Sequence, residues 1–341
     1  MTATLNDIAK LTGVDKGSIS RVLRNHPRAM DLRPETRERI VEAARKLGYR
    51  RNELAATMRT GTTRTVAVIS SYVRMAHASS SYNTVLSGIL KEASRVDYGV
   101  KIYADDNLAS CVDKIMSHQI KHVLSMSVDH QQRVETATLC RLHSLKLVFV
   151  YEDSQGEFPA VTTANRIAAR DVVLHFAGLG HRRIALICGP HQFNYVNELH
   201  AGYVQGLAEA GLEQDQQLIA CGEELEPRER AIEAMLRMPS SSRPTAFFCI
   251  GDLMAMWVQR AAFKNKLRVP EDVSVIGYGN SELGEAAVTP LSSVDQPYSQ
   301  MGETALRVLL GLPCDDLPSP VDGCYLLPNK LITRDSVARR K

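Results

Sequence analysis

The chain has 341 residues, enough for two or three domains. Its hydrophobic fraction of 44% and charged fraction of 23% are typical of a globular protein, and no window approaches 18 consecutive apolar residues, which excludes a membrane-spanning helix. Residues 1–65 carry fourteen Lys and Arg against seven Asp and Glu, so this segment has a net charge of +7 within a total of +3. The imbalance indicates a polyanionic partner for the N-terminal segment alone.

The sequence offers no sign of catalytic or metal chemistry. The seven cysteines are scattered without a Cys-x-x-Cys pair, and we expect them to be reduced core residues rather than disulfides or metal ligands. His118 and His122 are four residues apart on an expected helix, but no third ligand accompanies them, so we predict no metal site. Nucleotide-binding glycine loops and the Gly-x-Ser-x-Gly elbow are absent, and we expect neither a cofactor nor enzymatic activity. No secretory signal is visible, which favours a cytoplasmic location.

Residues 4–48 have the pattern of three short helices. Thr4 is a suitable cap for the first helix, which Gly13 ends. Asp15 is placed to cap the second, and Pro34 at a first-turn position opens the third, which Gly48 ends.

The first two of these helices meet the demands of a helix-turn-helix. Such a unit requires a small residue where the helices touch, a residue tolerant of positive φ in the turn, and a β-branched core residue after it. Ala9, Gly13 and Ile19 occupy these places. Together with the basic excess, they predict a DNA-binding headpiece.

From residue 65 onward, apolar strands alternate with helices. We expect strands at 66–69, 100–104, 123–126, 147–151, 184–188, 218–221, 246–250 and 273–276. We expect helices at 83–96, 111–119, 167–177, 196–210, 228–238 and 254–264. This alternation is typical of parallel sheets covered by helices, and about 275 residues are too many for one five- or six-stranded sheet, so we predict two lobes.

Several longer runs are distinctive. The N-terminal part contains TLNDIAKLTGV at 4–14, SISRVLRN at 18–25, ETRERI at 35–40, LGY at 47–49 and MRTG at 58–61. The core contains LGHRRIA at 179–185, GP at 189–190, VPEDVSVIGY at 269–278, SVDQP at 293–297 and MG at 301–302. Over nearly its whole length the chain therefore resembles the lactose-repressor (LacI/GalR) family of bacterial transcription regulators. The resemblance implies a small all-α helix-turn-helix headpiece plus an α/β core of two parallel-sheet lobes, like those of periplasmic binding proteins.

The resemblance also implies boundaries. The DNA-binding domain takes residues 1–49, a hinge helix or linker 50–61, and an effector-binding and dimerisation core 62–337. Lobe one takes about 62–162 and 293–322, and lobe two about 163–290 and 323–337. We expect the chain to cross between the lobes near 161–163, 290–293 and 321–324.

The implied function is that of a sequence-specific transcription regulator. We expect a repressor that binds a pseudo-palindromic DNA operator as a homodimer and responds to a small-molecule effector held between its lobes. The C-terminus has no leucine heptads, so a tetramer through a terminal coiled coil is not expected. The alternative is a binding protein or α/β enzyme with an incidental N-terminal helical piece.

In such a protein the second helix lies in the major groove. The resemblance places Lys16, Gly17 and Arg21 at base-reading positions. Lys and Arg can donate to guanine, whereas Gly17 offers no side chain, so specificity rests more on the other two. Contacts to the DNA backbone are implied for Ser18, Ser20 and Asn25, and more weakly for Thr4 and Tyr49.

The hinge is a second DNA-reading device. The resemblance implies that residues 52–59, beginning at Asn52, fold into a helix on DNA and that Met58 wedges into a minor-groove base step. Ala55 lets two hinge helices approach each other. Arg51 stands where the family usually has Pro. Because each hinge needs a partner hinge, this interpretation requires a dimer.

The effector cleft departs from the family pattern. Leu199 stands where Arg is usual, Gly251 precedes Asp252 where a polar residue is usual, and Gly279 and Ala164 replace Asp. A buried sugar needs partners for its hydroxyls, so these losses argue against an ordinary sugar. The alternatives are a less polar or differently oriented effector, a protein partner, and a loss of small-molecule sensing. The candidate effector-contacting residues are Tyr72, Arg74, Tyr151, His191, Asn194, Leu199, Asp252 and Tyr298.

Overall fold

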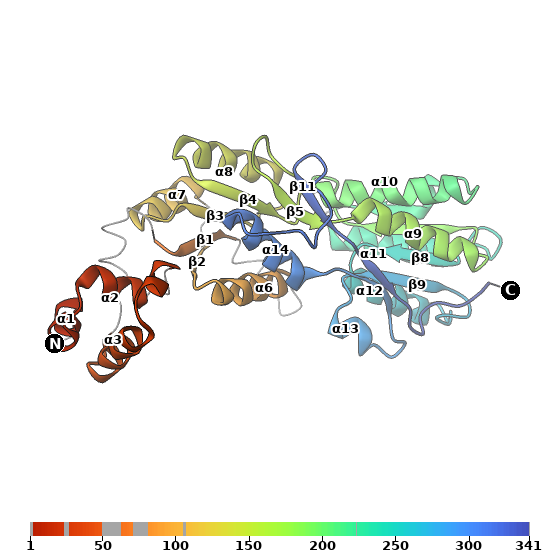
Figure 1. The fold of residues 1–341 in the computed structure, drawn as a ribbon. Helices are drawn as coiled ribbons and strands as arrows, with labels where there is room; N and C mark the ends of the chain where they lie inside the picture. The colour runs from red at the N-terminus through yellow and green to blue at the C-terminus, as the bar shows by residue number, and fades with distance from the viewer. Residues whose placement is uncertain are drawn as a thin grey trace. The chain divides into compact units, whose positions relative to one another are not determined.

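The computed structural model describes residues 3–23, 27–49, 63–70, 81–104, 107–222 and 224–340. The chain divides after Thr63 into an N-terminal unit, the headpiece, and a larger unit, the core. Figure 1 traces the elements of both units from red to blue along the chain. Among the described residues, no helix combines the length and the apolar character needed to cross a membrane.

The headpiece is a small helical unit. Its elements are α1 (Leu5–Thr12), α2 (Lys16–Val22), the 3-10 turn η1 (Pro27–Asp31) and α3 (Pro34–Lys46). Gly13 ends α1 in the left-handed region with a φ of 66°, and its N–H donates to the carbonyl of Ala9. Ile8, Ile19 and Ile40, one from each helix, are fully buried together. The helix-turn-helix predicted from its turn glycine and its β-branched core residue is confirmed.

Lobe one of the core has a sheet with the strand order β11-β5-β4-β3-β1-β2, and its neighbouring strands run parallel. The strands are β1 (Thr65–Ile69), β2 (Gly99–Tyr103), β3 (His122–Ser125), β4 (Lys146–Val150), β5 (Ala160–Thr163) and β11 (Cys324–Leu327). The helices of this lobe are α6 (Ser81–Arg95), α7 (Leu108–Ser117), α8 (His130–Leu142) and α14 (Tyr298–Leu310).

Lobe two has a sheet with the order β12-β10-β9-β8-β6-β7, in which only the pairing of β12 with β10 among the described strands is antiparallel. The strands are β6 (Ile184–Cys188), β7 (Ile219–Cys221), β8 (Ala246–Cys249), β9 (Ser274–Tyr278), β10 (Ser292–Asp295) and β12 (Lys330–Ile332). The helical elements are α9 (Asn165–Gly178), α10 (Asn194–Glu209), η2 (Gln216–Leu218), α11 (Leu225–Leu236), α12 (Asp252–Lys264) and α13 (Glu282–Glu285).

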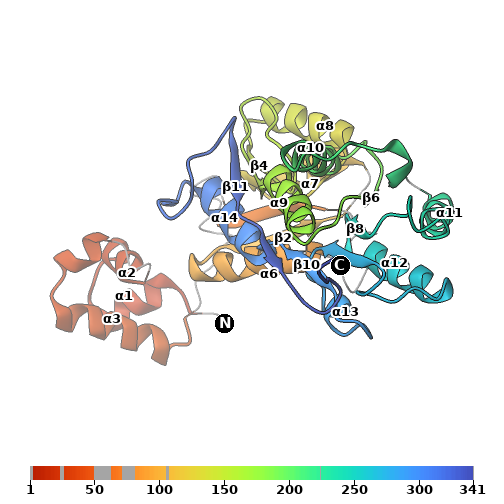
Figure 2. The ribbon, with the colours of Figure 1, turned by 90° about the vertical axis from the view of Figure 1, so that its right-hand side faces the viewer.

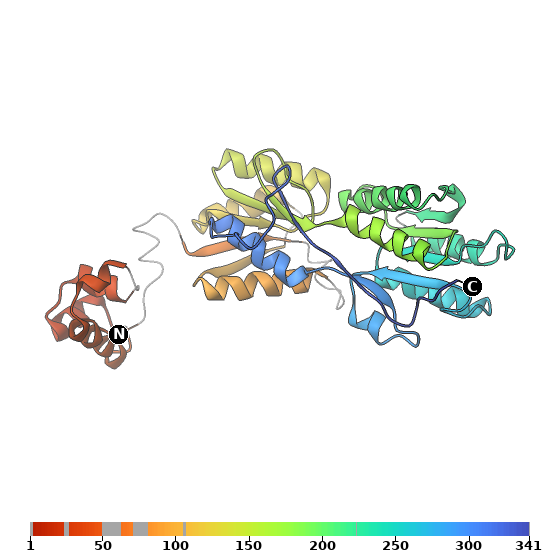
Figure 3. The same ribbon diagram turned by 45° about the vertical axis from the view of Figure 1, so that its right-hand side comes forward.

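Each sheet is covered on both faces, as Figure 3 shows for the two lobes. In lobe one, α6 and α14 pack on one face and α7 and α8 on the other. In lobe two, α9 and α10 pack on one face and α11 and α12 on the other. Double coverage explains why these strands are continuous apolar runs rather than alternating ones. The predicted two-lobed α/β core is confirmed.

Glycines bring two pairs of helices into close contact. Figure 2 shows α6 beside α14 in lobe one and α9 beside α10 in lobe two. A Cβ at Gly302 of α14 would collide with the carbonyl oxygen of Val85, and one at Gly202 of α10 would collide with that of Arg166. Only glycine permits these backbones to approach so closely.

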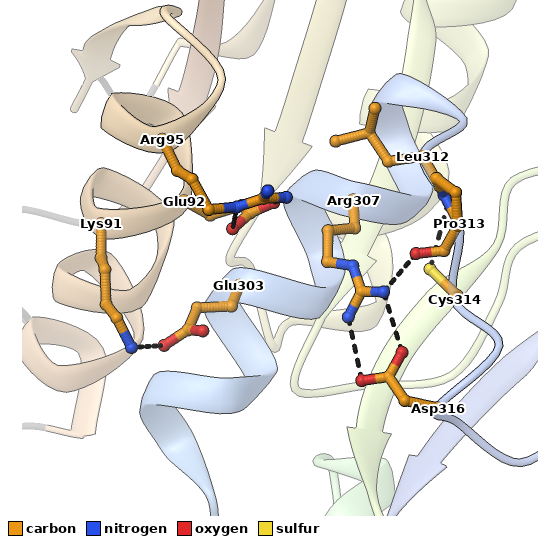
Figure 4. A network of polar contacts seen from close by, with 9 residues as sticks. All are labelled: Lys91, Glu92, Arg95, Glu303, Arg307, Leu312, Pro313, Cys314 and Asp316. Atoms are coloured by element: carbon orange, nitrogen blue, oxygen red, sulfur yellow. Dashed lines mark hydrogen bonds and ion pairs between the residues drawn. The ribbon is translucent and has the colours of Figure 1, made fainter.

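Figure 4 shows an ion pair between α6 and α14 and a second one between α14 and the segment after it. Lys91 of α6 reaches Glu303 of α14 with an Nζ–O distance of 2.8 Å. Arg307, near the end of α14, pairs with Asp316 at 2.8 Å and also donates to the carbonyl of Pro313. These contacts hold the segment that leads from α14 toward β11.

The chain crosses between the lobes a few residues later than the sequence predicts. The crossings lie at residue 164, at 296–297 and at 328–329, between strands and helices of different sheets. The expected second crossing came too early because β10, with Ser292 and Ser293, does not look apolar although both serines are buried. Residues 324–327, expected in lobe two, pair as β11 with β5 of lobe one.

The expectation that all seven cysteines are reduced is also wrong. A disulfide joins Cys188, the last residue of β6, to Cys221, the last residue of β7. The two residues are direct partners in the parallel register, and their Cα atoms are 4.5 Å apart. Because they are 33 residues apart in the sequence, the sequence pattern does not reveal that they are neighbours.

The glycine contact in lobe one predicts a strong position-specific effect. Gly302→Ala should lower the free energy of unfolding by about 1–3 kcal/mol, because the new methyl group must push α14 away from α6. Gly178→Ala, at the exposed end of α9 where a Cβ meets nothing within 4 Å, is the matched control and should be neutral or slightly stabilising. Urea denaturation of the full chain measures both. Equal effects would contradict the role given to the contact.

Candidate functional site

The first turn of α2 presents the residues expected to read bases. Lys16 and Gly17 are exposed there, and Arg21 follows one turn later and is half-buried. Asp15 caps the helix by accepting from the N–H of Ser18 at 2.9 Å. The guanidinium of Arg21 donates to the hydroxyl of Ser18 at 3.0 Å, which holds the arginine side chain along the helix.

The residues expected to contact the DNA backbone differ in their surroundings. Ser18 is buried, so its hydroxyl supports Arg21 rather than facing solvent. Thr4 is exposed, but its N–H and hydroxyl both donate to the carboxylate of Asp7, and these bonds lower the pKa of Asp7. Ser20 and Tyr49 are half-buried. Asn25, Asn52, Ala55 and Met58 lie outside the described residues, as does Arg51.

A cavity of about 670 Å³, including space open to solvent, lies between the two lobes of the core. Both lobes supply its walls, and none of the described lining residues carries a formal charge. The lining residues are Ser81, Tyr82, Val128, Tyr151, Thr162, Thr163, Asn165, Tyr195, Ile250, Gly251, Tyr278, Gln296, Tyr298 and Met301.

Aromatic rings dominate the lobe-one wall of this cavity. Tyr82 and Tyr151 are stacked, with ring centroids 4.8 Å apart and an interplanar angle of 22°. Tyr298, at the start of α14, lies next to them, with its ring centroid 6.2 Å from that of Tyr151. The cavity can therefore place a planar apolar group against tyrosine faces.

The floor of the cavity is a hydrogen-bond network that joins the three crossings. Asn165 Oδ1, just after the first crossing, accepts from the hydroxyls of Thr163 at 2.9 Å and Tyr278 at 2.5 Å. Asn329, in the third crossing, donates to the Tyr278 hydroxyl at 3.2 Å. Gln296, in the second crossing, accepts from Thr163 at 3.3 Å. Burial raises the pKa of Tyr278, so its hydroxyl stays protonated and can donate.

None of these network residues was among the predicted effector-contacting residues. Only Tyr151 and Tyr298 among the expected effector residues line the cavity, while Tyr72 and Arg74 lie outside the described residues. Asn165 and Gln296 follow strands β5 and β10, and the positions after strand ends in parallel sheets are where ligand-contacting residues gather. That signal was missed because both strands were missed.

The other expected effector residues lie elsewhere. Leu199 is fully buried in the core of lobe two. His191 is exposed and Asn194 half-buried, and neither lines the cavity. The buried Asp252 accepts from the N–H of Ser281 and from the hydroxyl of Ser293, both at 2.5 Å, so each carboxylate oxygen has a partner within the protein.

Two histidine positions bear on metal binding. His118 follows α7 and His122 begins β3, so they do not share a helix as expected, and His118 contacts Lys101 and Tyr103 instead. Metal-ligating atoms do gather at another place among the described residues, where Cys188, His191 and Cys221 meet outside the cavity.

Comparisons with known proteins agree with both units. Residues 4–52 match the family described as bacterial regulatory proteins of the lacI family, and residues 173–337 match the periplasmic binding protein-like domain. The HTH-type transcriptional repressor CytR of Escherichia coli (strain K12) is 29% identical over 321 residues, which cover 90% of this chain and 89% of that protein. The repressor PurR of Erwinia tasmaniensis is 27% identical over 314 residues, with 90% and 89% covered.

Solved structures match over the full length. The structure of the transcriptional regulator CelR in complex with cellobiose superposes with a TM-score of 0.67 at 26% sequence identity. The match covers 98% of this chain and 99% of the CelR chain. The lac repressor dimer bound to operator and the anti-inducer ONPF has a TM-score of 0.75 at 23% identity, with 99% and 100% covered, which shows a shared fold.

The network at the cavity floor yields a testable prediction. Tyr278→Phe keeps the ring but removes the hydroxyl between Asn165 and Asn329, and we expect it to lower the free energy of unfolding by about 1–3 kcal/mol. Tyr325→Phe, at a half-buried tyrosine of β11 outside the network, should change it by less than about 0.5 kcal/mol. Urea denaturation followed by circular dichroism measures both. An unchanged stability of the first variant would show that the hydroxyl does not bind the crossings together.

Proposed function

Because the chain belongs to the lactose-repressor (LacI/GalR) family of bacterial transcription regulators, we propose that it is a repressor that binds a pseudo-palindromic operator as a homodimer. It is a DNA-binding transcription regulator with an effector-binding core. The observation that carries the proposal is the exposed first turn of α2, with Lys16 on it and Arg21 one turn later, within a segment of net charge +7.

We assign base reading to Lys16 and Arg21. Both can donate to the O6 and N7 of guanine from a helix in the major groove. The bond from Arg21 to Ser18 supports this role, because it orders the guanidinium before DNA arrives. Gly17 leaves its position without a side chain. We assign phosphate contacts to Ser20, Asn25, Thr4 and Tyr49. The Thr4 hydroxyl can make such a contact only when its hydrogen bond to Asp7 is broken. The hinge roles of Asn52, Ala55 and Met58 remain part of this proposal.

The homodimer rests on two kinds of support. The lac repressor in one of the similar structures is a dimer bound to its operator. In this chain, Leu253 of α12 and Leu283 of α13 are exposed apolar side chains on two helices in contact, which suits association with a second copy. Two identical headpieces then read two half-sites.

The effector is proposed to be an uncharged molecule with an aromatic or planar apolar part. Tyr82, Tyr151 and Tyr298 offer faces for such a part, while Asn165 and Gln296 offer a few directional hydrogen bonds. A carboxylate or phosphate would be desolvated there without a described cationic partner. A disaccharide such as the cellobiose held by CelR would leave many hydroxyls unpaired.

The mode of action is binding rather than catalysis. The relatives are regulators, and the described cavity lining holds neither a paired acid and base nor a nucleophile beside a base. Since its proposed binding partner is operator DNA, we place the protein in the cytoplasm.

DNA reading is tested with a duplex that the wild-type chain selects from a random pool. Arg21→Ala should weaken binding about 10- to 100-fold and relax selection at one base pair in each half-site, because a bidentate contact to guanine is lost. Fluorescence anisotropy gives the affinities, and sedimentation gives the stoichiometry, expected to be two chains per duplex.

Lys46→Ala is the matched control for charge. Lys46 is an exposed cation in the last turn of α3, away from α2, and its removal should leave the selected sequence unchanged. If the wild-type chain selects no sequence and its binding is only salt-labile, the regulator proposal fails and the alternative of a binding protein or enzyme gains support.

Effector class is tested with matched pairs of aromatic amides and aromatic carboxylates, together with cellobiose. Amides should raise the melting temperature of the full chain, since a ligand at a hundred times its Kd stabilises by about 2.7 kcal/mol. Tyr151→Ala should abolish the shift, whereas Tyr325→Ala should retain it.

Stronger stabilisation by a carboxylate or by cellobiose would refute the proposed class. An absence of any shift, with DNA selection intact, would instead favour a protein partner or a core that no longer senses a small molecule.

A further inference from the structure

Two sulfurs and an imidazole meet at the carboxyl ends of β6 and β7. The ligand atoms of Cys188, His191 and Cys221 all lie within 4.8 Å of one another. A tetrahedral zinc ion with Zn–S bonds of about 2.3 Å and a Zn–N bond of about 2.0 Å needs separations of about 3.5–3.8 Å between such atoms. The imidazole already lies within reach of both sulfurs, which must themselves move apart to about 3.8 Å once the bond between them is reduced.

The sheet register brings the two sulfurs together. Cys188 and Cys221 are direct partners on neighbouring parallel strands, so their side chains project from the same face. Cys188 is fully buried, whereas Cys221 is half-buried and borders a surface hollow with Gly222, Glu224 and Arg228. The buried Cys188 thus holds one sulfur in a fixed position, and the half-buried Cys221 leaves the other open to solvent.

The imidazole is held in the manner of a metal ligand. Asn197 donates from Nδ2 to the carbonyl of His191 at 2.9 Å, which leaves its Oδ1 to accept from the ring Nδ1 at 3.0 Å. With the proton on Nδ1, the lone pair is on Nε2. Histidines that bind metals usually have their second nitrogen oriented by such a carbonyl. A disulfide alone requires neither the imidazole nor the amide.

We propose that Cys188, Cys221 and His191 form a site for a thiophilic divalent cation of the zinc type, available only when the disulfide is reduced. Three protein ligands leave the fourth position for water. A dithiol reductant opens the site: it gives two electrons and two protons to the two sulfurs and becomes a disulfide itself. The ion then replaces the two thiol protons, which are released to solvent.

The location links the site to the effector cavity. His191 lies two positions before Phe193, which is the N-cap of α10 and packs against the cores of both lobes. Tyr195, in the first turn of α10, lines the cavity. An ion on His191 therefore fixes the segment that forms one wall of the cavity.

The site is tested on the full chain in both redox states. The chain reduced with a phosphine, and freed of it under argon, is titrated with Zn²⁺ against a chromophoric chelator and separately with Co²⁺. We expect one ion per chain and a thiolate-to-cobalt absorption band. The air-oxidised chain, with its disulfide intact, should bind neither ion.

Variants assign the ligands. His191→Ala and Cys221→Ser, at accessible positions that should not disturb folding, are each expected to weaken zinc binding by more than about tenfold, and Cys221→Ser should also halve the cobalt band. Asn197→Ala should weaken binding by about 10- to 100-fold. His130→Ala and Cys314→Ser, at an exposed histidine and a thiol remote from the group, are the controls and should change neither.

Three results would overturn the site: no stoichiometric ion on the reduced chain, equal binding by the oxidised chain, or unaltered binding after His191→Ala. If zinc binding is lost when the cysteines are replaced but never when His191 is, the reduced dithiol binds the ion without the imidazole, and the three-ligand site is refuted. None of these outcomes depends on DNA or effector binding, so they leave the regulator proposal untouched.

Discussion

One tyrosine hydroxyl ties the two lobes together. Tyr278 ends β9 in lobe two, and its hydroxyl lies between Asn165 and Asn329, which belong to two different chain crossings. The remaining crossing, at 296–297, joins through the hydrogen bond from Thr163 to Gln296. Buried hydrogen bonds of this kind are costly to break singly, so the crossings keep a fixed relation to one another. Because the same residues form the floor of the cavity, a bound molecule contacts the joint itself.

Each lobe is closely packed in its own right. The sheets are covered on both faces, and Gly302 and Gly202 let α14 pack on α6, from a distant part of the chain, and α10 on the preceding helix α9, backbone to backbone. Close-packed lobes change shape little, so strain imposed at the cavity is relieved by rotation about the crossings. The regulatory role proposed for the cavity depends on this division between stiff lobes and a hydrogen-bonded hinge.

Sequence patterns were sufficient where the physical requirement is local. Gly13 must adopt a positive φ and Ile19 must be buried, and both demands are visible within fifteen residues. The strand β10 escaped prediction because Ser292 and Ser293 find partners in Arg334 and Asp252, which the local pattern does not reveal. The pairing of Cys188 with Cys221 and the meeting of Asn165 with Tyr278 depend on strand register and crossing geometry, and no periodicity encodes either.

The late arrival of β11 has a consequence for synthesis on the ribosome. The headpiece is complete once residue 49 has emerged, whereas lobe one lacks its cover helix α14 and its edge strand β11 until residue 327 has emerged. Domains generally fold as units in order of emergence. For most of translation, a nascent chain thus has a folded, basic headpiece attached to an incompletely folded core. If the proposed homodimer pairs through the finished core, tight operator binding is delayed until the sensor is present.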